Sequence, residues 1–262
     1  MEFVEPKAIH IAATSVLDIG LSEYLTAVGV SNWTTDAPTD AEKLIEVAGR
    51  MCYRSFAPGL NPNVTKVRNG NAPYIANVEL QKHGSLLEHA YDTYVLFDVS
   101  RILTHQQVRH RAGFSYAQES GHYVRVEGIK MWFPAYFAGH PKATLLKAKF
   151  VEVCEYLEQT QLWLATELDL DNLPFEEKKR ATTSMRRLVP DGLATAIVVS
   201  ANHRAWRWAL QLRTARSNDD EIRLVMADVY RQQAAMYPNL YADAHVELFN
   251  GIEEVTFGNE KI

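Results

Sequence analysis

Residues 91–113 decide the fold, and they read YDTYVLFDVSRILTHQQVRHRAG. The first ten, Tyr91 to Ser100, are rich in aromatic and β-branched side chains, which is typical of a short strand. From Ser100 to His110 the pattern becomes helical, and Gly113 ends it. The chain therefore passes from a strand directly into a helix.

Helical patterns outnumber strand patterns in the rest of the chain. Other strand-like segments lie at 8–15, 120–127 and 193–200. Helices are expected at 41–55, 73–82, 142–168, 174–187, 202–214 and 219–236, several of them preceded by a capping residue or a proline. We predict a helix-rich α+β fold with a modest, mostly antiparallel sheet. No long linker or internal repeat is visible, so residues 1–262 are expected to form a single domain.

Helical periodicity assigns a buried face to two of these helices. In 142–168 the apolar stripe comprises Leu145, Leu146, Phe150, Val153, Leu157 and Leu162. In 202–214 the apolar positions are Ala205, Trp208, Ala209 and Leu212, which turns Arg204, Arg207 and Gln211 to the opposite, polar face. Arg213 lies at the edge of that apolar stripe, where a guanidinium is partly desolvated.

Composition excludes several classes of protein. The 262 residues include 27 Lys and Arg against 32 Asp and Glu, a net charge of −5, which argues against a general nucleic-acid binder. Cys52 and Cys154 lie far apart, so neither a disulfide scaffold nor a thiolate metal site is expected, and a cytoplasmic location fits best. The first residues show no secretory pattern, and the longest apolar run, 193–201, is too short to span a bilayer.

The net charge conceals two arginine-rich windows. Residues 101–125 hold four Arg and one acid, Glu119, and residues 180–216 hold seven Arg and one acid, Asp191. These windows carry +3 and +6, whereas the remaining chain balances at −14. Neither window contains Lys. Because Arg grips phosphate or carboxylate at two points, the pattern indicates an anion site, and solvated helix faces are the alternative.

The densest polar stretch is 106–123, QQVRHRAGFSYAQESGHY. Glycine-rich phosphate loops, the H-E-x-x-H motif and the G-x-S-x-G motif are all missing from the sequence. Adjacent cations at Arg109, His110 and Arg111 repel one another unless an anion lies between them, and a pyrophosphate meets that need. The alternative is a solvated helix end, where Arg and His favour the dipole.

The Arg-His-Arg stretch followed by Ser120 resembles the signature of the flavin-dependent thymidylate synthases. Upstream, the segment 83–89, HGSLLEH, resembles the family's His-x-[Ser/Thr]-x-x-Glu-His. Downstream, the segments at 186–190, 202–206, 212–213 and 221–223 resemble the family's C-terminal half in order and spacing. The segment 48–53 extends the resemblance, which is strongest over residues 30–245.

The resemblance implies a single catalytic domain with the fold of the thymidylate synthase complementing proteins. It implies a homotetramer with shared active sites that converts dUMP to dTMP. FAD would be the cofactor, 5,10-methylenetetrahydrofolate the one-carbon donor and NADPH the reductant. The reduced flavin delivers hydride, and no protein nucleophile attacks the base in that family. Neither nucleic acid nor membrane is an expected partner.

The resemblance also assigns site residues. Arg213 would be catalytic, since a guanidinium at the uracil stabilises the anion that develops on the ring. The FAD contacts would be Ser85, Arg109, His110, Arg111, Gln118, Asn202, His203 and Arg204. The dUMP contacts would be Gln106, Gln107, Val108, Arg109, Gln118, Glu119, Ser120, Gly121, His122, Arg186 and Arg213. No metal site is expected, because the histidine spacings do not suit one ligand.

Four departures from the family pattern concern the site. Eight residues, not seven, separate Arg111 from Ser120, so the loop after Arg111 must bulge. His122 stands where the family has an Arg on the substrate phosphate, and we hypothesise that His122 or Arg125 supplies this contact. Gln118 replaces Glu, and Trp208 replaces Asn or His.

Two other functions stay open at this point. In one, the protein is a non-catalytic nucleotide or single-strand binder whose Arg windows hold phosphates and whose aromatic residues stack on bases. In the other, it is a helical oligomeric scaffold that has lost activity, which the changes at His122 and Trp208 would permit. The aromatic residues Tyr123, Trp132, Phe133, Tyr136 and Phe137 are expected to pack in the core or at an interface more often than on a ligand.

Overall fold

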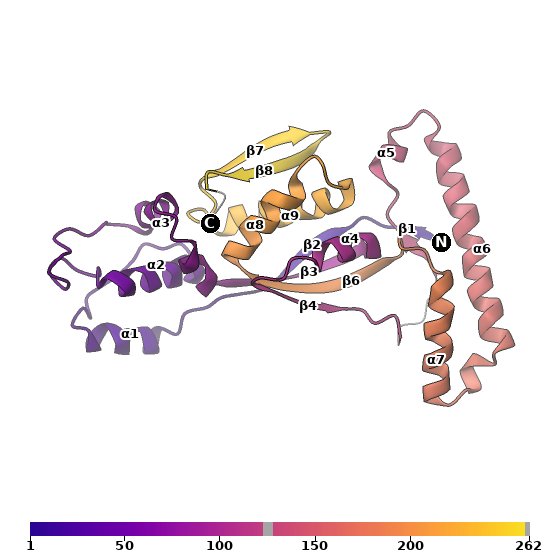
Figure 1. Ribbon diagram of the computed structural model, residues 1–262, viewed down its shortest axis with the longest axis horizontal. Coiled ribbons are helices and arrows are strands. Elements are labelled where there is room, and N and C mark those ends of the chain that lie inside the picture. Colours follow the sequence, from indigo (N-terminus) through magenta and orange to yellow (C-terminus); the bar gives the residue numbers. More distant parts are fainter. Residues whose placement is uncertain (123–127, 260–262) are drawn as a thin grey trace.

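The computed structural model describes residues 1–122 and 128–259, and a four-stranded antiparallel sheet forms its centre (Figure 1). In order across the sheet, the strands are β2 (Lys7–Ala13), β3 (Tyr91–Ser100), β6 (Ala194–Asn202) and β4 (Phe114–Gln118). The predicted strands at 8–15, 91–100 and 193–200 are confirmed, as is the mixed, mostly antiparallel fold. Of the strand expected at 120–127, residues 120–122 are not in a strand, and 123–127 lie outside the described residues.

Helices gather at both ends of the sheet and over one of its faces (Figure 1). One end carries α1 (Asp18–Ala27), α2 (Asp40–Tyr53), α3 (Asn71–Leu80) and the 3₁₀ helix η1 (Gly84–His89). The other end carries α5 (Ala135–Ala138), α6 (Ala143–Glu167), η2 (Leu170–Asn172), α7 (Phe175–Met185) and η3 (Arg186–Leu188). There β1 (Glu2–Phe3) pairs in parallel with β5 (Lys130–Met131). No helix in the described ranges is long and apolar enough to cross a membrane.

The remaining elements lie over one face of the sheet, and α8 (His203–Thr214) among them carries Arg204, Arg207 and Arg213. They are α4 (Arg101–Gln107), α8, α9 (Asp220–Met236) and a hairpin of β7 (Ala244–Phe249) and β8 (Ile252–Phe257). Helices α8 and α9 pack against each other, and the hairpin covers them on the side away from the sheet (Figure 1). Sequence analysis did not predict β4, α1 or the hairpin.

Side-chain caps fix the starts of α4 and α8. The Ser100 hydroxyl accepts a hydrogen bond from the Leu103 amide at 3.0 Å and so starts α4 at the end of β3. The Asn202 side chain accepts from the Ala205 amide at 2.8 Å and starts α8 at the end of β6. Each cap satisfies an amide that would otherwise lack a partner. Both strand-to-helix junctions are therefore encoded by the capping residue.

The predicted core face of α8 is right for Ala205 and Ala209 and wrong for Trp208 and Leu212. Trp206, Ala209 and Leu210 are fully buried, whereas Trp208 and Leu212 are 51% and 41% exposed. Arg207, expected on a solvated face, is also fully buried. Arg207 is enclosed by residues on the side of the hairpin. Its Nη1 and Nη2 donate to the Asp243 carboxylate at 2.9 and 2.8 Å, and its guanidinium carbon lies 4.0 Å from the centre of the Phe257 ring. Periodicity alone assumes one buried face, but α8 lies between the sheet and the hairpin.

The apolar stripe predicted for α6 is only partly buried. Phe150 and Leu157 pack against a small core cluster with Cys154, but Leu145, Val153 and Leu162 are exposed. The reason is that α6 projects at the end of the sheet and meets the rest of the chain along a narrow side (Figure 1). The exposed fraction of Trp163, on the same helix, is 59%.

Candidate active site

The Arg-His-Arg segment is folded back onto β4 by a tyrosine. The Tyr116 hydroxyl lies 2.8 Å from the backbone carbonyls of both Gln107 and His110, and these two carbonyls share its one proton. Burial raises the pKa of Tyr116 well above its usual value, so the hydroxyl stays protonated and keeps donating. Gly113 makes the turn between the segment and β4 with φ of +76°, a backbone conformation that other residues rarely adopt. The signature is thus held between α4 and β4.

Arg213 joins the last turn of α8 to this segment. Its Nε donates to His110 Nε2 at 2.8 Å, and its Nη2 donates to the Gln106 carbonyl at 3.0 Å. Its Nη1 donates to Asn218 Oδ1 at 3.3 Å. The structure therefore brings together three residues that the sequence had assigned to the site from segments about a hundred positions apart.

His110 is the neutral partner in this arrangement. Burial, reinforced by the charge of Arg213, lowers the pKa of His110 to about 4. Because Nε2 accepts the bond from Arg213, the proton of the neutral ring sits on Nδ1. Burial and the nearby Arg109 charge lower the pKa of Arg213 as well, but a guanidinium remains charged at neutral pH. The pair thus presents a fixed positive charge on Arg213 alone.

Arg213 has donors to spare. A guanidinium carries five N–H groups, and His110, Gln106 and Asn218 use one each. Within the described part of the chain, one N–H on each Nη is therefore left for a ligand. Two such donors suit a carbonyl, a deprotonated nitrogen or another planar acceptor.

Arg109 and Arg111 point to a phosphorylated ligand. Both side chains are exposed, and neither forms an ion pair with a carboxylate of the described residues. Two guanidiniums within three positions repel each other unless an anion neutralises them. The donor set fits the diphosphate of a dinucleotide such as FAD.

Four other FAD candidates lie at the junction of β6 with α8 and in η1, and a fifth, Gln118, lies at the end of β4. Ser85 is exposed in η1. Arg204 of α8 forms an ion pair at 2.6 Å with Glu88, which also lies in η1. Asn202 uses its side-chain oxygen as the cap of α8. His203 is fully buried beside Tyr241 and Tyr237, so its ring packs in the core of this chain. The FAD contacts assigned to these four residues remain predictions.

Several of the dUMP candidates lie at the far end of β4. Gln118 donates to the Thr104 hydroxyl at 3.1 Å, and Glu119 accepts from the Thr195 hydroxyl and the Ala196 amide at 3.0 and 3.2 Å. The Ser120 hydroxyl accepts from the His122 amide at 3.1 Å. This serine bonds to an amide rather than to a base, and its role toward a ligand remains a prediction.

His122 and Arg186 lie near the same end of β4. The His122 ring lies 2.8 Å from the Thr183 hydroxyl and lines a cleft of about 120 Å³ with Lys178 and Lys179. Burial and the charge of Arg101 lower the pKa of Arg186, while Glu119 opposes the shift. Arg125, the other candidate for the phosphate contact, lies outside the described residues, as does Tyr123.

Three dUMP candidates offer less to a ligand. Gln107 is fully buried and, within the described chain, its side-chain amide forms no hydrogen bond. Val108 is 38% exposed, and Gly121 has open space where a side chain would be. Their contacts with dUMP remain predictions.

Among the described residues, the predicted site residues form two groups. The group at Arg213, His110 and Asn202 adjoins the start of β4, and the group at Glu119 and Ser120 follows its end. The five residues of this strand separate the groups by about 17 Å. In the described ranges, no group of three or more His, Cys, Asp and Glu side chains is arranged to hold a metal ion.

Sequence reasoning missed two residues that shape the site. Tyr116 and Asn218 contact the signature and Arg213 directly, yet neither was singled out. Tyr116 lies inside the polar stretch, where alternation of ring and small side chains over 114–118 was the available signal of a strand. Asn218 gave no signal, because only the folded loop brings it to Arg213.

Known proteins resemble this chain along most of its length. The family model described as "Thymidylate synthase complementing protein" matches residues 35–239. A flavin-dependent thymidylate synthase from Mycobacterium marinum is 34% identical over 241 residues, covering 91% of this chain and 93% of the relative. A protein of the same name from Mycobacteroides abscessus is 34% identical over 220 residues, covering 81% and 82% of the two chains.

Solved structures agree on the fold. A UMP/dUMP methylase (PolB) from Streptomyces cacaoi, bound with 5-Br dUMP, superposes with a TM-score of 0.61 and covers 92% of this chain and 96% of its own. The same methylase bound with 5-Br UMP superposes with a TM-score of 0.63. At 16% and 15% sequence identity, these likenesses concern the fold alone.

Proposed function

The chain belongs to the thymidylate synthase complementing protein family, and from that premise we propose that it is a flavin-dependent thymidylate synthase. It would convert dUMP to dTMP with 5,10-methylenetetrahydrofolate as one-carbon donor, FAD as cofactor and NADPH as reductant. The observation that carries the proposal is the junction of Arg213 with His110 and the Gln106 carbonyl. A non-catalytic nucleotide binder is not favoured, because the relatives of matching length bear the name of the enzyme.

The chemistry of Arg109, His110 and Arg111 suits the binding of FAD. Arg109 and Arg111 would hold the diphosphate, since they are exposed and lack carboxylate partners in the described chain. His110, held neutral, keeps its Nδ1 proton for a hydrogen bond to the ring system or a phosphate oxygen. When bound, the reduced flavin supplies the hydride that the new methyl group requires.

Arg213 would act on the uracil of dUMP. Its two spare N–H groups would donate to the ring as negative charge develops there, which lowers the barrier to carbon–carbon bond formation at C5. His110 and the Gln106 carbonyl hold the guanidinium in place before the substrate arrives, so little reorganisation is needed. Arg186, Ser120 and His122, at the other end of β4, would contact the ribose or phosphate.

We further propose a homotetramer with shared sites, formed by residues 1–262 as a single catalytic domain. The distance between the two groups along β4 supports sharing, because a neighbouring subunit would supply what one chain lacks. The exposed apolar side chains of α6, Trp163 and Leu145 among them, support an interface. Both cysteines are free, which supports the cytoplasm as its location.

The decisive experiment measures dTMP formed from dUMP, methylenetetrahydrofolate, NADPH and FAD by the purified protein. We expect turnover that requires all four and a yellow protein with a flavin absorption band. Arg213→Ala should keep the flavin and lose turnover. A wild-type protein that binds flavin but forms no dTMP would refute the proposal and favour the inactive scaffold. A colourless protein with salt-sensitive oligonucleotide binding would favour the non-catalytic binder.

A further inference from the structure

The β7–β8 hairpin lies beyond the residues that the family model matches, yet it is firmly built into the fold. Its turn is Asn250-Gly251, with φ of 54° and 77°, the conformation that a two-residue hairpin turn requires. Val255 is fully buried against α8 and α9, and the hairpin covers both helices (Figure 1). Its position raises the question of what it holds in place.

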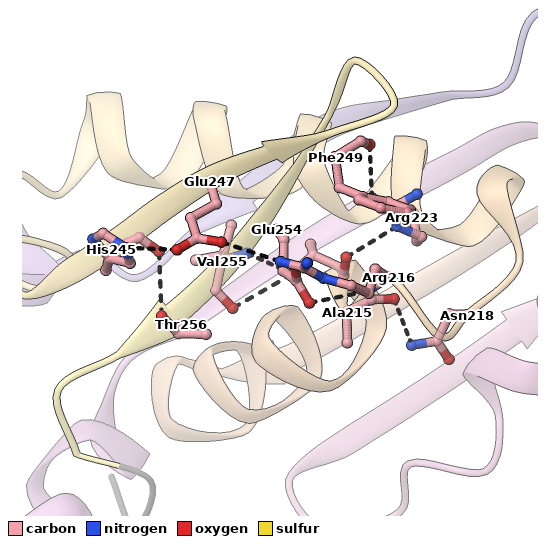
Figure 2. A network of polar contacts seen from close by, with 11 residues as sticks. Ala215, Arg216, Asn218, Arg223, His245, Glu247, Phe249, Glu254, Val255 and Thr256 are labelled. Carbon is pink, nitrogen blue, oxygen red and sulfur yellow. Dashed lines mark hydrogen bonds and ion pairs between the residues drawn. The ribbon is translucent and has the colours of Figure 1, made fainter.

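The hairpin forms hydrogen bonds and ion pairs with the loop that follows Arg213. Glu254 of β8 accepts from the backbone amide of Arg216 at 3.0 Å and from its Nε at 2.6 Å, and Glu247 of β7 accepts from Nη2 at 3.1 Å (Figure 2). The Val255 amide donates to the Thr214 hydroxyl at 2.9 Å. The residues one and three positions after Arg213 are therefore both tied to the hairpin.

Arg223 of α9 closes the same loop from its other end. Its Nη2 donates to the Phe249 carbonyl of β7, and its Nε donates to the Thr214 carbonyl, both at 3.1 Å. Figure 2 shows Arg223 beside Phe249 and Arg216 beside Glu254, so the hairpin spans both ends of the loop. Since Arg223 and Thr214 are fully buried, these bonds are shielded from water.

The loop in turn holds the guanidinium of Arg213. Asn218 accepts from Arg213 Nη1 at 3.3 Å, while its Nδ2 donates to the carbonyls of Leu212 and Ala215 at 2.7 and 3.1 Å. Asn218 is thus a bridge between the end of α8 and the Arg213 side chain. The path of residues 214–218 decides where this bridge stands.

We infer that the β7–β8 hairpin positions Arg213 for its reaction, with Glu254 as the principal positioning residue. The inference rests on the proposed function of Arg213. The final turn of a helix lacks partners for its carbonyls and frays easily, and catalytic groups tolerate only about 0.5 Å of displacement. The hairpin supplies the rigidity that α8 lacks at this end.

Glu254→Ala tests this inference, and the same strand offers a matched control. Glu253 forms an ion pair with Arg231 of α9 at 2.8 Å and makes no contact with the loop after Arg213. We expect Glu254→Ala to lower kcat by about tenfold, since misplacement of a group by ~1 Å can cost about a hundredfold. Glu253→Ala should stay within about twofold of wild type, and Glu254→Gln, which keeps an acceptor for Arg216, should restore most of the rate.

Two further measurements separate positioning from general destabilisation. Hydrogen exchange of residues 213–218, measured without substrate, should rise in Glu254→Ala and not in Glu253→Ala, while melting temperature and flavin content match between the two. In an Arg213→Lys background, Glu254→Ala should lower kcat by less than about twofold, because effects that act through one residue are not additive.

The outcomes distinguish this inference from the proposed function. If wild type forms no dTMP, the proposed function fails, and the exchange measurement still decides whether the hairpin holds the loop. If wild type is active but the two Ala variants have equal rates and equal exchange, the inference fails. It also fails if the loss of kcat persists unchanged in the Arg213→Lys background.

Discussion

Gly113 is the residue at which the signature turns into β4, and its replacement by alanine tests the geometry of the site. Its φ is +76°, and an added Cβ would lie 2.8 Å from Asn202 Nδ2 and 2.9 Å from the Cβ of Ala205. Both contacts are shorter than real Cβ atoms make. Asn202 caps α8, and Ala205 sits in its first turn. The substitution therefore pushes directly on the start of the helix that carries Arg213.

The cost can be estimated from two parts. An alanine in the left-handed region costs about 1–2 kcal/mol. Displacing the Asn202 side chain removes a helix cap worth about 1 kcal/mol, and the Ala205 Cβ cannot move without the backbone of α8. We expect Gly113→Ala to lower the free energy of unfolding by about 2–3 kcal/mol. It should also weaken FAD binding, because Asn202 and Arg204 are candidate contacts.

Gly29→Ala is the control, since it isolates the backbone effect. Gly29 has φ of +80° and nothing within 4 Å of an added Cβ. Urea unfolding should show a loss of about 1–2 kcal/mol for this variant and a larger loss for Gly113→Ala. Flavin titration should show weaker binding only for Gly113→Ala. Equal unfolding losses and equal flavin affinities in the two variants would refute the reasoning.

Three further predictions concern charge. Because the pKa of His110 is about 4 in the folded protein and 6.5 for an unperturbed histidine, its contribution to stability is complete above pH 6.5 and is lost as the pH falls toward 4. The change in unfolding free energy between these pH values should be smaller by about 3 kcal/mol in His110→Gln than in wild type, and an equal change in the two proteins would contradict this. Burial, opposed by an arginine, raises the pKa of Glu79 to about 8, so stability should fall as the pH rises from 4.5 to 8. Glu79→Gln should therefore be more stable than wild type at pH 8 by urea unfolding, and a less stable variant would contradict this. Arg213→Lys should lower kcat by about a hundredfold or more, because the planar donor pair is lost, with a smaller change in dUMP affinity measured by calorimetry.

The sequence predicted the elements whose signals are local. Ser100 and Asn202 are capping residues at strand-to-helix junctions, and α4 and α8 begin one residue after them. Residues 91–100 alternate as a buried strand does, and β3 has those bounds. The segments β4 and β7–β8 were missed for different reasons. The signature's polar side chains obscure the alternation of β4. Asn250-Gly251, by contrast, is a strong hairpin signal, but no hairpin was predicted from it.

The site was predictable as a set of residues but not as a geometry. Motif order identified Arg213 and His110, yet nothing in their spacing states that one donates to the other. Periodicity failed for Arg207 because α8 is covered on two sides, by the sheet and by the hairpin. The charge of Arg207 is met by Asp243, which lies outside the helix. Long-range packing, supplied by segments more than thirty positions away, decides such cases.

The described arginines of the two arginine-rich windows fall into two groups, those that contact a carboxylate of the chain and those that do not. Arg207, Arg204 and Arg216 each face a carboxylate within 2.8 Å, so their charge is met inside the chain. Arg109 and Arg111 have no carboxylate partner in the described residues, and Arg213 bonds only to neutral acceptors. A positive charge next to neutral acceptors keeps its field, which reaches a ligand with little screening where water is excluded. These three arginines are therefore available to anionic ligands, and the phosphates of FAD and dUMP, with the anion that develops on the uracil, would supply the negative charge they face.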